Sequence, residues 1–556
     1  MTDAPTTTPY DDPYEPKPTL WQRRPNLGWV LGVFVMTVIL TYIAFPPLNK
    51  GEAAYVLALP GVLWAFRRPA FKLYAITILS AHAVAWTALL WWLHNVTWPG
   101  LFLLGPFIGL LVGVWFLAVW WAIPRMYPHK AFVRILVVLG LAGLWVLNEW
   151  LRHVIFGGFP WLPLSVSQWQ RPFILQVAAF GGGWAVSYAL ICFNVGAAAY
   201  VHRAFFERVT GLRKRSPEFN VALLVLMSAS FPFLGQTFNQ QREPLLRTTL
   251  VQPYIPQNEK WDSARANDVL RTIEQVTFEA AARGAGNVIL WPEAVTPWAL
   301  YRDPQVAEWL TSVAKRAKKP ILLGSVYTEG AEGPDQKWFN GAFLVDPASG
   351  VSGDNYAKRK LVPFGEFIPL RPVFGWLEKF VPIGGDFQRG DISSPIMLPA
   401  IGGNRVPTGV LICYEDIFPW LARDSVQTGA EMLVVLTNNG WFGEGGAAYQ
   451  HAAHSVLRAV ETRRPLIRVG NGGWSGWVDE YGYIRKTLTD ENGSVYFRGS
   501  ETVTISRDVR WRERESFYTQ HGEWFLFVCV GLVALGYIAL ATSRPPRLEP
   551  GEAARF

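Results

Sequence analysis

The run GLFLLGPFIGLLVGVWFLAVWWAI at residues 100–123 contains no Asp, Glu, Lys or Arg. A helix of about 20 apolar residues crosses the hydrocarbon core of a bilayer, so this run predicts a membrane-spanning helix. Comparable runs lie before and after it, and together they predict a polytopic α-helical membrane bundle of about eight transmembrane helices. The expected spans are residues 27–45, 52–66, 73–94, 100–123, 132–151, 173–201, 219–237 and 523–542.

The composition agrees with a large membrane-embedded part. Of the 556 residues, 50% are hydrophobic, and the 27 Trp and 34 Phe are a high share for a water-soluble enzyme. The second run is short and contains Pro60, so a tilted or broken helix fits there as well as a straight span does. The net charge of +8 includes no Lys/Arg block long enough to bind nucleic acid, which excludes that class of partner.

The loops differ strongly in basic residues, and loops rich in Lys and Arg stay in the cytoplasm. One set of loops carries only Lys50, Arg152 and Arg171. The asymmetry therefore predicts a cytoplasmic amino terminus and an outward-facing polar segment after the seventh helix. The basic residues of the cytoplasmic set are Lys17, Arg23, Arg24, Arg67, Arg68, Lys72, Arg125, Lys130, Arg134, Arg203, Arg208, Arg213, Lys214 and Arg215.

These features divide the chain into five regions. The polar tail at the amino terminus lacks a short apolar segment with a cleavage site, so we expect an uncleaved cytoplasmic tail and no signal peptide. The expected regions are the tail at 1–26, a seven-helix bundle at 27–240, an outer domain at 245–510, a transmembrane helix at 520–543 and a cytoplasmic tail at 544–556.

The outer segment has a different sequence pattern, in which short β-rich runs alternate with helical stretches such as 262–284 and 447–464. Such alternation predicts one α/β domain outside the membrane. The expected strands are Thr248–Val251, Val288–Trp291, Ile321–Val326, Val410–Cys413 and Met432–Thr437.

Three candidate reactive residues follow such strands or lie in the loops beyond them. Glu293 lies in LWPEA (290–294), Lys358 in YAKRKLVPFGE (356–366) and Cys413 in GVLICYED (409–416). Strand ends are where α/β enzymes gather catalytic groups. Cys192 and Cys529 fall in apolar runs, so Cys413 is the one cysteine of the water-soluble segment.

The three residue types suit acyl transfer. A cysteine attacks an acyl carbonyl as the thiolate, so it needs a cation that lowers its pKa and a base that takes its proton. Lys358 and Glu293 supply these groups, and the ammonium together with a backbone N–H beside Cys413 would stabilise the oxyanion. Each residue taken singly also fits a structural role, as a small core residue or a surface charge.

Taken together, the motifs resemble the Glu-Lys-Cys triad of the nitrilase (carbon-nitrogen hydrolase) superfamily, in the form seen in the apolipoprotein N-acyltransferase family. The resemblance covers nearly the whole chain, and it implies a bacterial inner-membrane protein with a periplasmic nitrilase-like αββα sandwich. Further shared stretches are Gly158–Trp161, Gln252–Gln257 followed by Trp261, Asn438–Phe442, and Arg458-x-x-Glu461-x-x-Arg464. The stretch Asn471–Ser475 departs from the family pattern, which affects the shape of the pocket and leaves the triad intact.

The resemblance also implies roles for residues around the triad. Glu366 and Glu415 are expected to hold Lys358 and the thiol in place, and the implied catalytic residues are Glu293, Lys358 and Cys413. The other active-site residues implied in this way are Tyr414, Trp261 and Asn340.

The resemblance implies a two-step activity without cofactors or metal. Cys413 would take a fatty acyl group from a membrane glycerophospholipid such as phosphatidylethanolamine, and the amino terminus of a diacylglyceryl-modified apolipoprotein would then receive it. Because such a donor stays in the bilayer, a membrane-tethered catalytic domain suits it. Two alternatives stay open: hydrolysis of an amide or nitrile by the same triad, and a non-catalytic transport or scaffold protein.

Two other features invite a functional reading. His451 and His454 form an H-x-x-H pattern without the glutamate of zinc peptidases, so we expect them on a helix surface and expect no metal. The apolar stretch 364–385 contains glycine hinges, and it fits a lid that dips toward lipid as well as it fits ordinary loop packing.

Overall fold

The computed structural model describes residues 25–206, 216–232, 240–284, 286–330, 332–333, 335–369, 371–375 and 386–544. The expected tails at 1–26 and 544–556 lie outside these ranges apart from their innermost residues. Also outside are Arg208, Arg213, Lys214 and Arg215, the end of the span expected at 219–237, and residues 370 and 376–385 of the expected lid.

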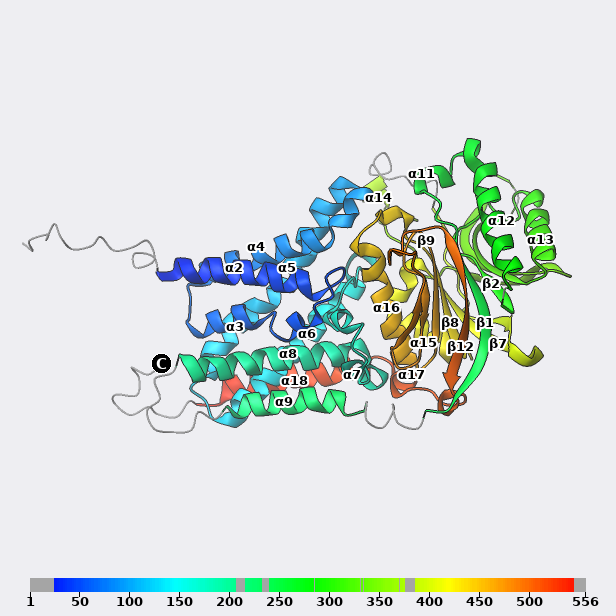
Figure 1. Cartoon of the computed structure of the whole chain (residues 1–556). Coiled ribbons are helices and arrows are strands. Elements are labelled where there is room, and N and C mark those ends of the chain that lie inside the picture. The colour runs from blue at the N-terminus through cyan, green and yellow to red at the C-terminus, as the bar shows by residue number, and fades with distance from the viewer. Residues whose placement is uncertain are drawn as a thin grey trace, which may run out of the picture.

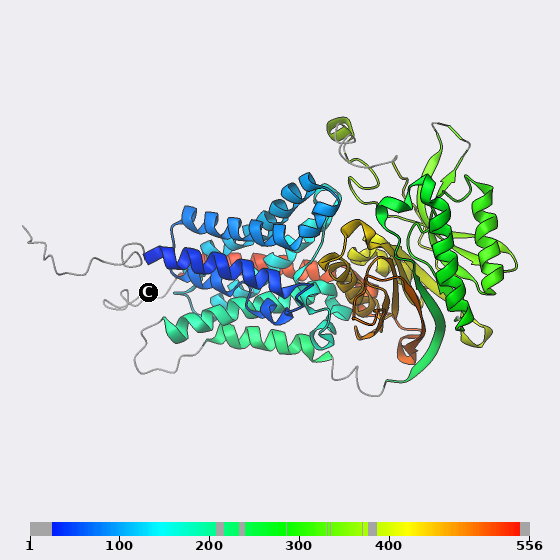
Figure 2. The same cartoon turned by 45° about the horizontal axis from the view of Figure 1, so that its top comes forward.

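The N-terminal part is a bundle of helices that lies end to end with an α/β domain (Figures 1 and 2). The last helix, α18, returns to the bundle and packs against α6 and α8. The bundle helices are α2 (Pro25–Ala44), α3 (Leu59–Phe66), α4 (Phe71–Leu89), α5 (Trp98–Met126), α6 (Ala131–Val154), α8 (Ala178–Phe205), α9 (Pro217–Ser230) and α18 (Trp524–Thr542).

Six helices within the described residues are long and apolar enough to cross a membrane, namely α2, α4, α5, α6, α8 and α18. The second expected span is broken: a 3-10 helix, η1 (Gly51–Tyr55), precedes α3, and Pro60 stands in the first turn of α3. Proline is tolerated there because the first helical N–H groups have no partner within the helix. Since α9 is also shorter than a full span, the count of eight transmembrane helices stays a prediction.

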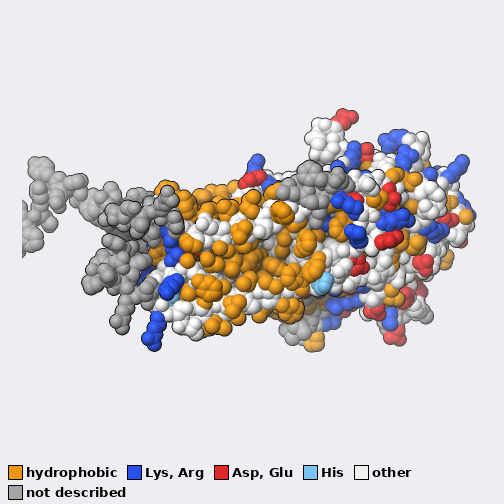
Figure 3. Space-filling model, turned by 90° about the horizontal axis from the view of Figure 1, so that it is seen from below, with side chains coloured by type: hydrophobic (Ala, Val, Ile, Leu, Met, Phe, Trp, Pro, Cys, Tyr) orange, Lys and Arg blue, Asp and Glu red, His pale blue; other side chains and the backbone are white. Residues whose placement is uncertain are grey.

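On the face shown in Figure 3, apolar side chains cover the bundle, whereas charged side chains gather on the α/β domain. Large exposed residues include Leu103, Phe132 and Phe527, each more than two thirds exposed. An apolar surface of this extent is stable when lipid tails cover it, which supports a membrane location for the bundle. Arg152, expected in an outer loop, instead lies buried in the last turn of α6 beside Glu149.

The α/β domain contains two six-stranded sheets within the described residues. The first has the order β12-β1-β2-β3-β4-β5 and the second the order β11-β10-β9-β8-β7-β6. Strands β1, β2 and β3 are parallel to one another, as are β7, β8 and β9, so each sheet gathers several strand ends at one edge. Each of the five expected strands overlaps an observed one.

The strands of the first sheet are β1 (Arg242–Gln252), β2 (Val288–Leu290), β3 (Ile321–Glu329), β4 (Lys337–Asp346), β5 (Gly350–Ala357) and β12 (Gly499–Asp508). Those of the second are β6 (Ile396–Pro399), β7 (Arg405–Ile412), β8 (Met432–Asn438), β9 (Leu466–Asn471), β10 (Gly476–Val478) and β11 (Ile484–Thr487).

Helices cover both outer faces, which confirms the expected αββα sandwich. Side chains such as Leu250 and Leu290 from one sheet and Val410 and Leu436 from the other form the core between the sheets. The helices α12 (Ala266–Ala282) and α13 (Pro304–Ala317) cover the first sheet, and α15 (Pro419–Gln427) and α16 (Gly446–Thr462) cover the second.

The second helix layer is not a free surface, because it lies between its sheet and the membrane bundle (Figure 1). Buried residues of α16 such as Val456 and bundle residues such as Trp161 belong to one continuous apolar core. Polar contacts cross the same joint: the Gly183 backbone N–H in α8 donates to Glu461 Oε1 in α16 at 2.8 Å. The α/β domain is therefore fixed against one end of the bundle.

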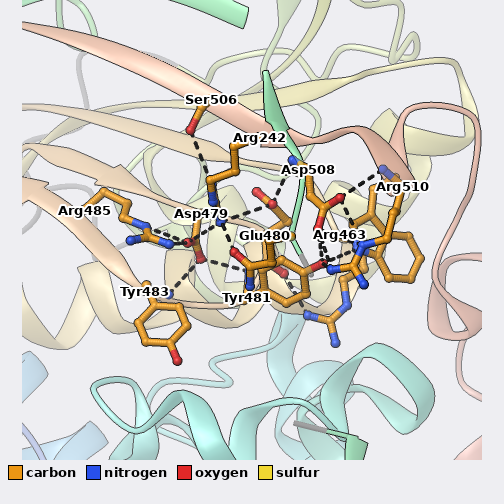
Figure 4. Close-up of polar contacts among 12 residues, drawn as sticks. Arg242, Arg463, Asp479, Glu480, Tyr481, Tyr483, Arg485, Ser506, Asp508 and Arg510 are labelled. Atoms are coloured by element: carbon orange, nitrogen blue, oxygen red, sulfur yellow. Dashed lines mark hydrogen bonds and ion pairs between the residues drawn. The ribbon is translucent and has the colours of Figure 1, made fainter. Parts of the chain in front are cut away.

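A polar cluster, buried around Arg463 and Asp479 and open to solvent at Arg485, lies at this joint beside the β10–β11 turn (Figure 4). Arg463, at the end of α16, donates from Nη1 to Gln176 Oε1 after α7 (Pro172–Leu175) and to the Glu480 carbonyl oxygen, each at 2.8 Å. Its guanidinium also lies over the Tyr481 ring. The labelled residues of the cluster are Arg242, Arg463, Asp479, Glu480, Tyr481, Tyr483, Arg485, Ser506, Asp508 and Arg510.

We expect Arg463→Met to lower the free energy of unfolding by about 3 kcal/mol, because it leaves two buried acceptors without their donor. Thermal unfolding in detergent measures the effect. The control is Arg485→Met, because Arg485 is 39% exposed and its pair with Asp479 should contribute at most about 1 kcal/mol. Equal shifts for the two variants would contradict the role given to the joint.

Candidate active site

Glu293 lies three residues beyond the end of β2, at the edge where strand ends of both sheets meet, and it is buried. Asn340 Nδ2 and Lys358 Nζ donate to its Oε1 at 2.8 and 3.2 Å. The Asn438 backbone N–H, at the end of β8, donates to its Oε2 at 3.0 Å. Burial would raise the pKa of Glu293, but Lys358, Asn340 and Lys260 outweigh it and lower this pKa, so the carboxylate is ionised at neutral pH.

Lys358 follows β5 directly and is buried between two carboxylates. Its Nζ lies 3.2 Å from Glu293 Oε1 and 2.9 Å from Glu366 Oε1. Burial would lower the pKa of Lys358, but these carboxylates raise it well above its ordinary value. Asn340 Nδ2 also reaches Glu366 Oε1 at 3.1 Å, so one amide bridges both acidic partners of the ammonium.

Cys413 begins the short helix η8 (Cys413–Ile417) at the end of β7, and its backbone is left-handed with φ of 51°. The side chain is 9% exposed. Burial and the charge of Glu293 raise the pKa of the thiol, which Lys358 and a hydrogen bond with Thr437 oppose, and the result is about 12. The sequence suggests a thiolate made by the nearby cation; in the structure burial wins, so the resting thiol keeps its proton.

Glu415 is buried and accepts hydrogen bonds from the end of β7 and from the loop after β5. Its Oε2 accepts from the Ile412 backbone N–H at 2.7 Å, and its Oε1 accepts from the Arg359 backbone N–H at 2.6 Å. Glu415 thus ties the residue before Cys413 to the residue after Lys358. The Lys358 ammonium itself bonds two other carboxylates, those of Glu366 and Glu293.

Tyr414 and Trp261 occupy different surroundings. The Tyr414 hydroxyl donates to the Gly158 carbonyl oxygen at 2.6 Å, so the residue after Cys413 bonds the end of the bundle that faces the α/β domain. Trp261 is 48% exposed and stands at the rim of the site, with Lys260 Nζ 5.7 Å from its ring centre. The structure gathers Glu293, Lys358, Cys413, Glu366, Glu415 and Asn340 in the interior and leaves Trp261 at the rim.

Lys260 and Asn438 join the site without having been singled out from the sequence. Lys260 is buried and donates from Nζ to the Glu293 carbonyl oxygen at 3.1 Å, and burial lowers its pKa to about 8. Asn438 Nδ2 donates to Gln257 Oε1 at 2.8 Å, and Gln257 lines a cavity of about 350 Å³ next to the site. Lys260 directly precedes Trp261, and Asn438 is the first residue of the shared stretch Asn438–Phe442. These positions were the signal in the sequence that could have identified both residues.

The expectation that His451 and His454 lie on a helix surface is wrong. Both are 1% exposed, because the membrane bundle covers the face of α16 that would be solvent-exposed in an isolated sandwich. The rings lie against Trp161 of the bundle, at 5.3 Å for His451 and 5.7 Å for His454 between centroids.

We expect alkylation of Cys413 by iodoacetamide to be slow at pH 7 and to rise about tenfold per pH unit without a plateau below pH 9, because only the thiolate reacts. Lys358→Met removes a charge that lowers the thiol pKa, so alkylation should slow further. Glu293→Gln removes a charge that raises it, so alkylation should quicken at a given pH.

Mass spectrometry of quenched samples gives these rates, with Cys413→Ala as the blank for Cys192 and Cys529. A plateau near pH 7 in the unmodified chain would mean a preformed thiolate and would contradict this electrostatic picture.

A helical membrane bundle carrying a two-sheet αββα domain, with cysteine, lysine and glutamate at the sheet edge, defines a membrane-anchored protein of the carbon-nitrogen hydrolase class. The family model "Carbon-nitrogen hydrolase" matches residues 247–506, and the model "Apolipoprotein N-acyltransferase N-terminal domain" matches residues 37–196. The chain belongs to the apolipoprotein N-acyltransferase family, a family of acyltransferase enzymes.

Curated relatives match over most of their length. The apolipoprotein N-acyltransferase of Geobacter metallireducens is 30% identical over 517 residues, which cover 90% of this chain and 93% of the relative. That of Vibrio vulnificus is 27% identical over 513 residues, covering 86% and 94%. Among solved structures, an amidase from Nesterenkonia sp. is 21% identical with a TM-score of 0.36, covering 53% of this chain and 99% of that one.

Proposed function

We propose that the chain transfers a fatty acyl group from a glycerophospholipid, phosphatidylethanolamine by the family resemblance, to the α-amine of the diacylglyceryl-cysteine of an apolipoprotein. The observation that carries this proposal is the position of Glu293, Lys358 and Cys413 beside the outer end of the membrane bundle. There the residue after the nucleophile bonds the bundle directly, through Tyr414 and Gly158. A donor that stays in the bilayer would reach a thiol at this joint.

In the first half-reaction the Cys413 thiol attacks the ester carbonyl while Glu293 takes its proton. Because the thiol is protonated at rest and Glu293 is ionised, the proton passes as the S–C bond forms. The Lys358 ammonium and a backbone N–H beside Cys413 stabilise the oxyanion. The ester C–O bond then breaks, Glu293 returns the proton to the leaving oxygen, and lysophospholipid departs from the acyl-thioester.

In the second half-reaction the α-amine attacks the thioester carbonyl. An α-amine has a pKa of roughly 8, so a large share is unprotonated near neutral pH. Glu293 takes the proton of the attacking nitrogen and passes it to the departing Cys413 sulfur, which yields an amide and the free thiol. The thioester supplies the activation, so the steps balance without ATP, metal or organic cofactor.

The location proposed for the chain is a bacterial inner membrane with the catalytic domain in the periplasm. Arg68 Nη2 donates to the Pro124 carbonyl oxygen, and Arg134 and Arg203 both pair with Glu218, so three basic loops meet at one end of the bundle. Tyr414 contacts the opposite end, at Gly158. The positive-inside bias supports placing the basic end in the cytoplasm, with the domain boundaries expected from the sequence.

We expect incubation of the purified protein with phosphatidylethanolamine to add one acyl mass, and a diacylglyceryl-cysteine peptide to remove it as N-acylated peptide. Intact-mass spectrometry measures both steps. Cys413→Ala should abolish the adduct, and Glu293→Gln should slow its formation by about 10²- to 10⁴-fold because the base is lost. Glu491→Gln, on an exposed turn, is the matched control.

An adduct that water removes equally fast with and without peptide would favour amide-type hydrolysis over transfer. No adduct with any phospholipid would overturn the lipid donor, and unchanged activity in Cys413→Ala would overturn the proposed nucleophile.

A further inference from the structure

A second polar cluster lies buried next to Cys413. The proposed acyl-transfer steps do not use it. It consists of His451 and Ser455 on α16, Asp416 in η8 and Arg468 on β9, none more than 1% exposed. Asp416 Oδ2 accepts from Ser455 Oγ at 2.6 Å and from Arg468 Nη1 at 2.5 Å, so this carboxylate is fixed from two elements.

The His451 ring connects this carboxylate to the backbone of the nucleophile. Its Nε2 hydrogen bonds to the Cys413 carbonyl oxygen at 3.1 Å and lies 2.8 Å from Asp416 Oδ1. Both oxygens only accept, so the ring proton resides on Nε2. On the other side, Nδ1 lies 3.3 Å from Asn439 Oδ1, and exchanging the oxygen and nitrogen of this amide lets the unpartnered Asn439 Nδ2 donate to Nδ1.

The backbone that this bond holds is strained. Cys413 adopts a left-handed φ of 51°, which side chains other than glycine rarely adopt and which persists only where the surroundings enforce it. Glu415 holds one side of the turn by accepting the Ile412 N–H at 2.7 Å. His451 holds the other side by donating to the Cys413 carbonyl oxygen.

We propose that His451, oriented by Asp416, is a positioning residue that holds the Cys413 turn so that the sulfur and the neighbouring backbone N–H face the acyl carbonyl together. It touches no reacting atom and acts through the backbone of the nucleophile. The inference rests on the proposed function of Cys413. A turn held from one side only would let the sulfur shift, and a misplacement of about 1 Å costs about 10² in rate.

The test compares two polar replacements of similar size. In His451→Gln the amide nitrogen reaches the place of Nε2 and donates to the Cys413 carbonyl oxygen, whereas in His451→Asn the amide ends near the place of Nδ1. We expect Asn to lower kcat for acyl-enzyme formation about 10²-fold with KM unchanged, and Gln to retain most of kcat. His454→Gln is the matched control, because His454 is equally buried on the same helix and its Nε2 faces the Leu162 N–H.

Equal losses in His451→Asn and His451→Gln, or a kcat loss in His454→Gln as large as in His451→Asn, would overturn the positioning role. Thermal unfolding of each variant separates a loss of folding from a loss of positioning. Alkylation of Cys413 by iodoacetamide needs no lipid, so it tests the inference even where the acyl transfer fails. The loosened turn of His451→Asn should expose the thiol and quicken alkylation about threefold or more against His451→Gln, and equal rates would count against the inference.

Discussion

The α/β domain buries the charges of Glu293 and Lys358 together. This requirement determines how the residues around the pair are arranged. Removing two ions from water costs several kcal/mol each, and their attraction offsets this only where further hydrogen bonds satisfy both groups. Asn340 and the Asn438 N–H donate hydrogen bonds to the Glu293 carboxylate, and the Lys358 ammonium donates one to Glu366. These partners come from β4, β8 and the loop after β5, so the ion pair exists only when both sheets are assembled.

The same packing of the two sheets determines the protonation state of the Cys413 thiol. Cys413 is buried with an ionised Glu293 nearby, and both raise the pKa of its thiol, so the thiol keeps its proton at neutral pH. A protonated thiol is a poor nucleophile toward adventitious electrophiles, and in the proposed mechanism it reacts with a carbonyl held against Glu293 and Lys358. Under the proposed function the joint with the bundle places the site near lipid, because α16 packs against the bundle and the Tyr414 hydroxyl bonds Gly158.

Much of this fold is visible in the sequence, since apolar runs mark the bundle, and β-rich runs that end just before Glu293 and at Cys413 mark the sheet edge. The triad and Glu366 could be named because they lie in the motifs that carry the family resemblance, whereas Asn340 was named through that resemblance alone, and the roles of all of them stay predictions. The burial of His451 and His454 could not be predicted, because an isolated helix pattern does not reveal that a second domain covers its outer face. The thiol pKa was also out of reach, because it depends on the balance between burial and two opposite charges, which only coordinates supply.

The most direct test of the account is to locate the acyl group on the chain after incubation with phospholipid, by acid quench, digestion and fragmentation mass spectrometry. The account predicts the acyl mass on the peptide containing Cys413 and its release by neutral hydroxylamine, as for a thioester. An acyl group on Lys260 or Lys358, or one that resists hydroxylamine, would contradict the central role of the Cys413 sulfur.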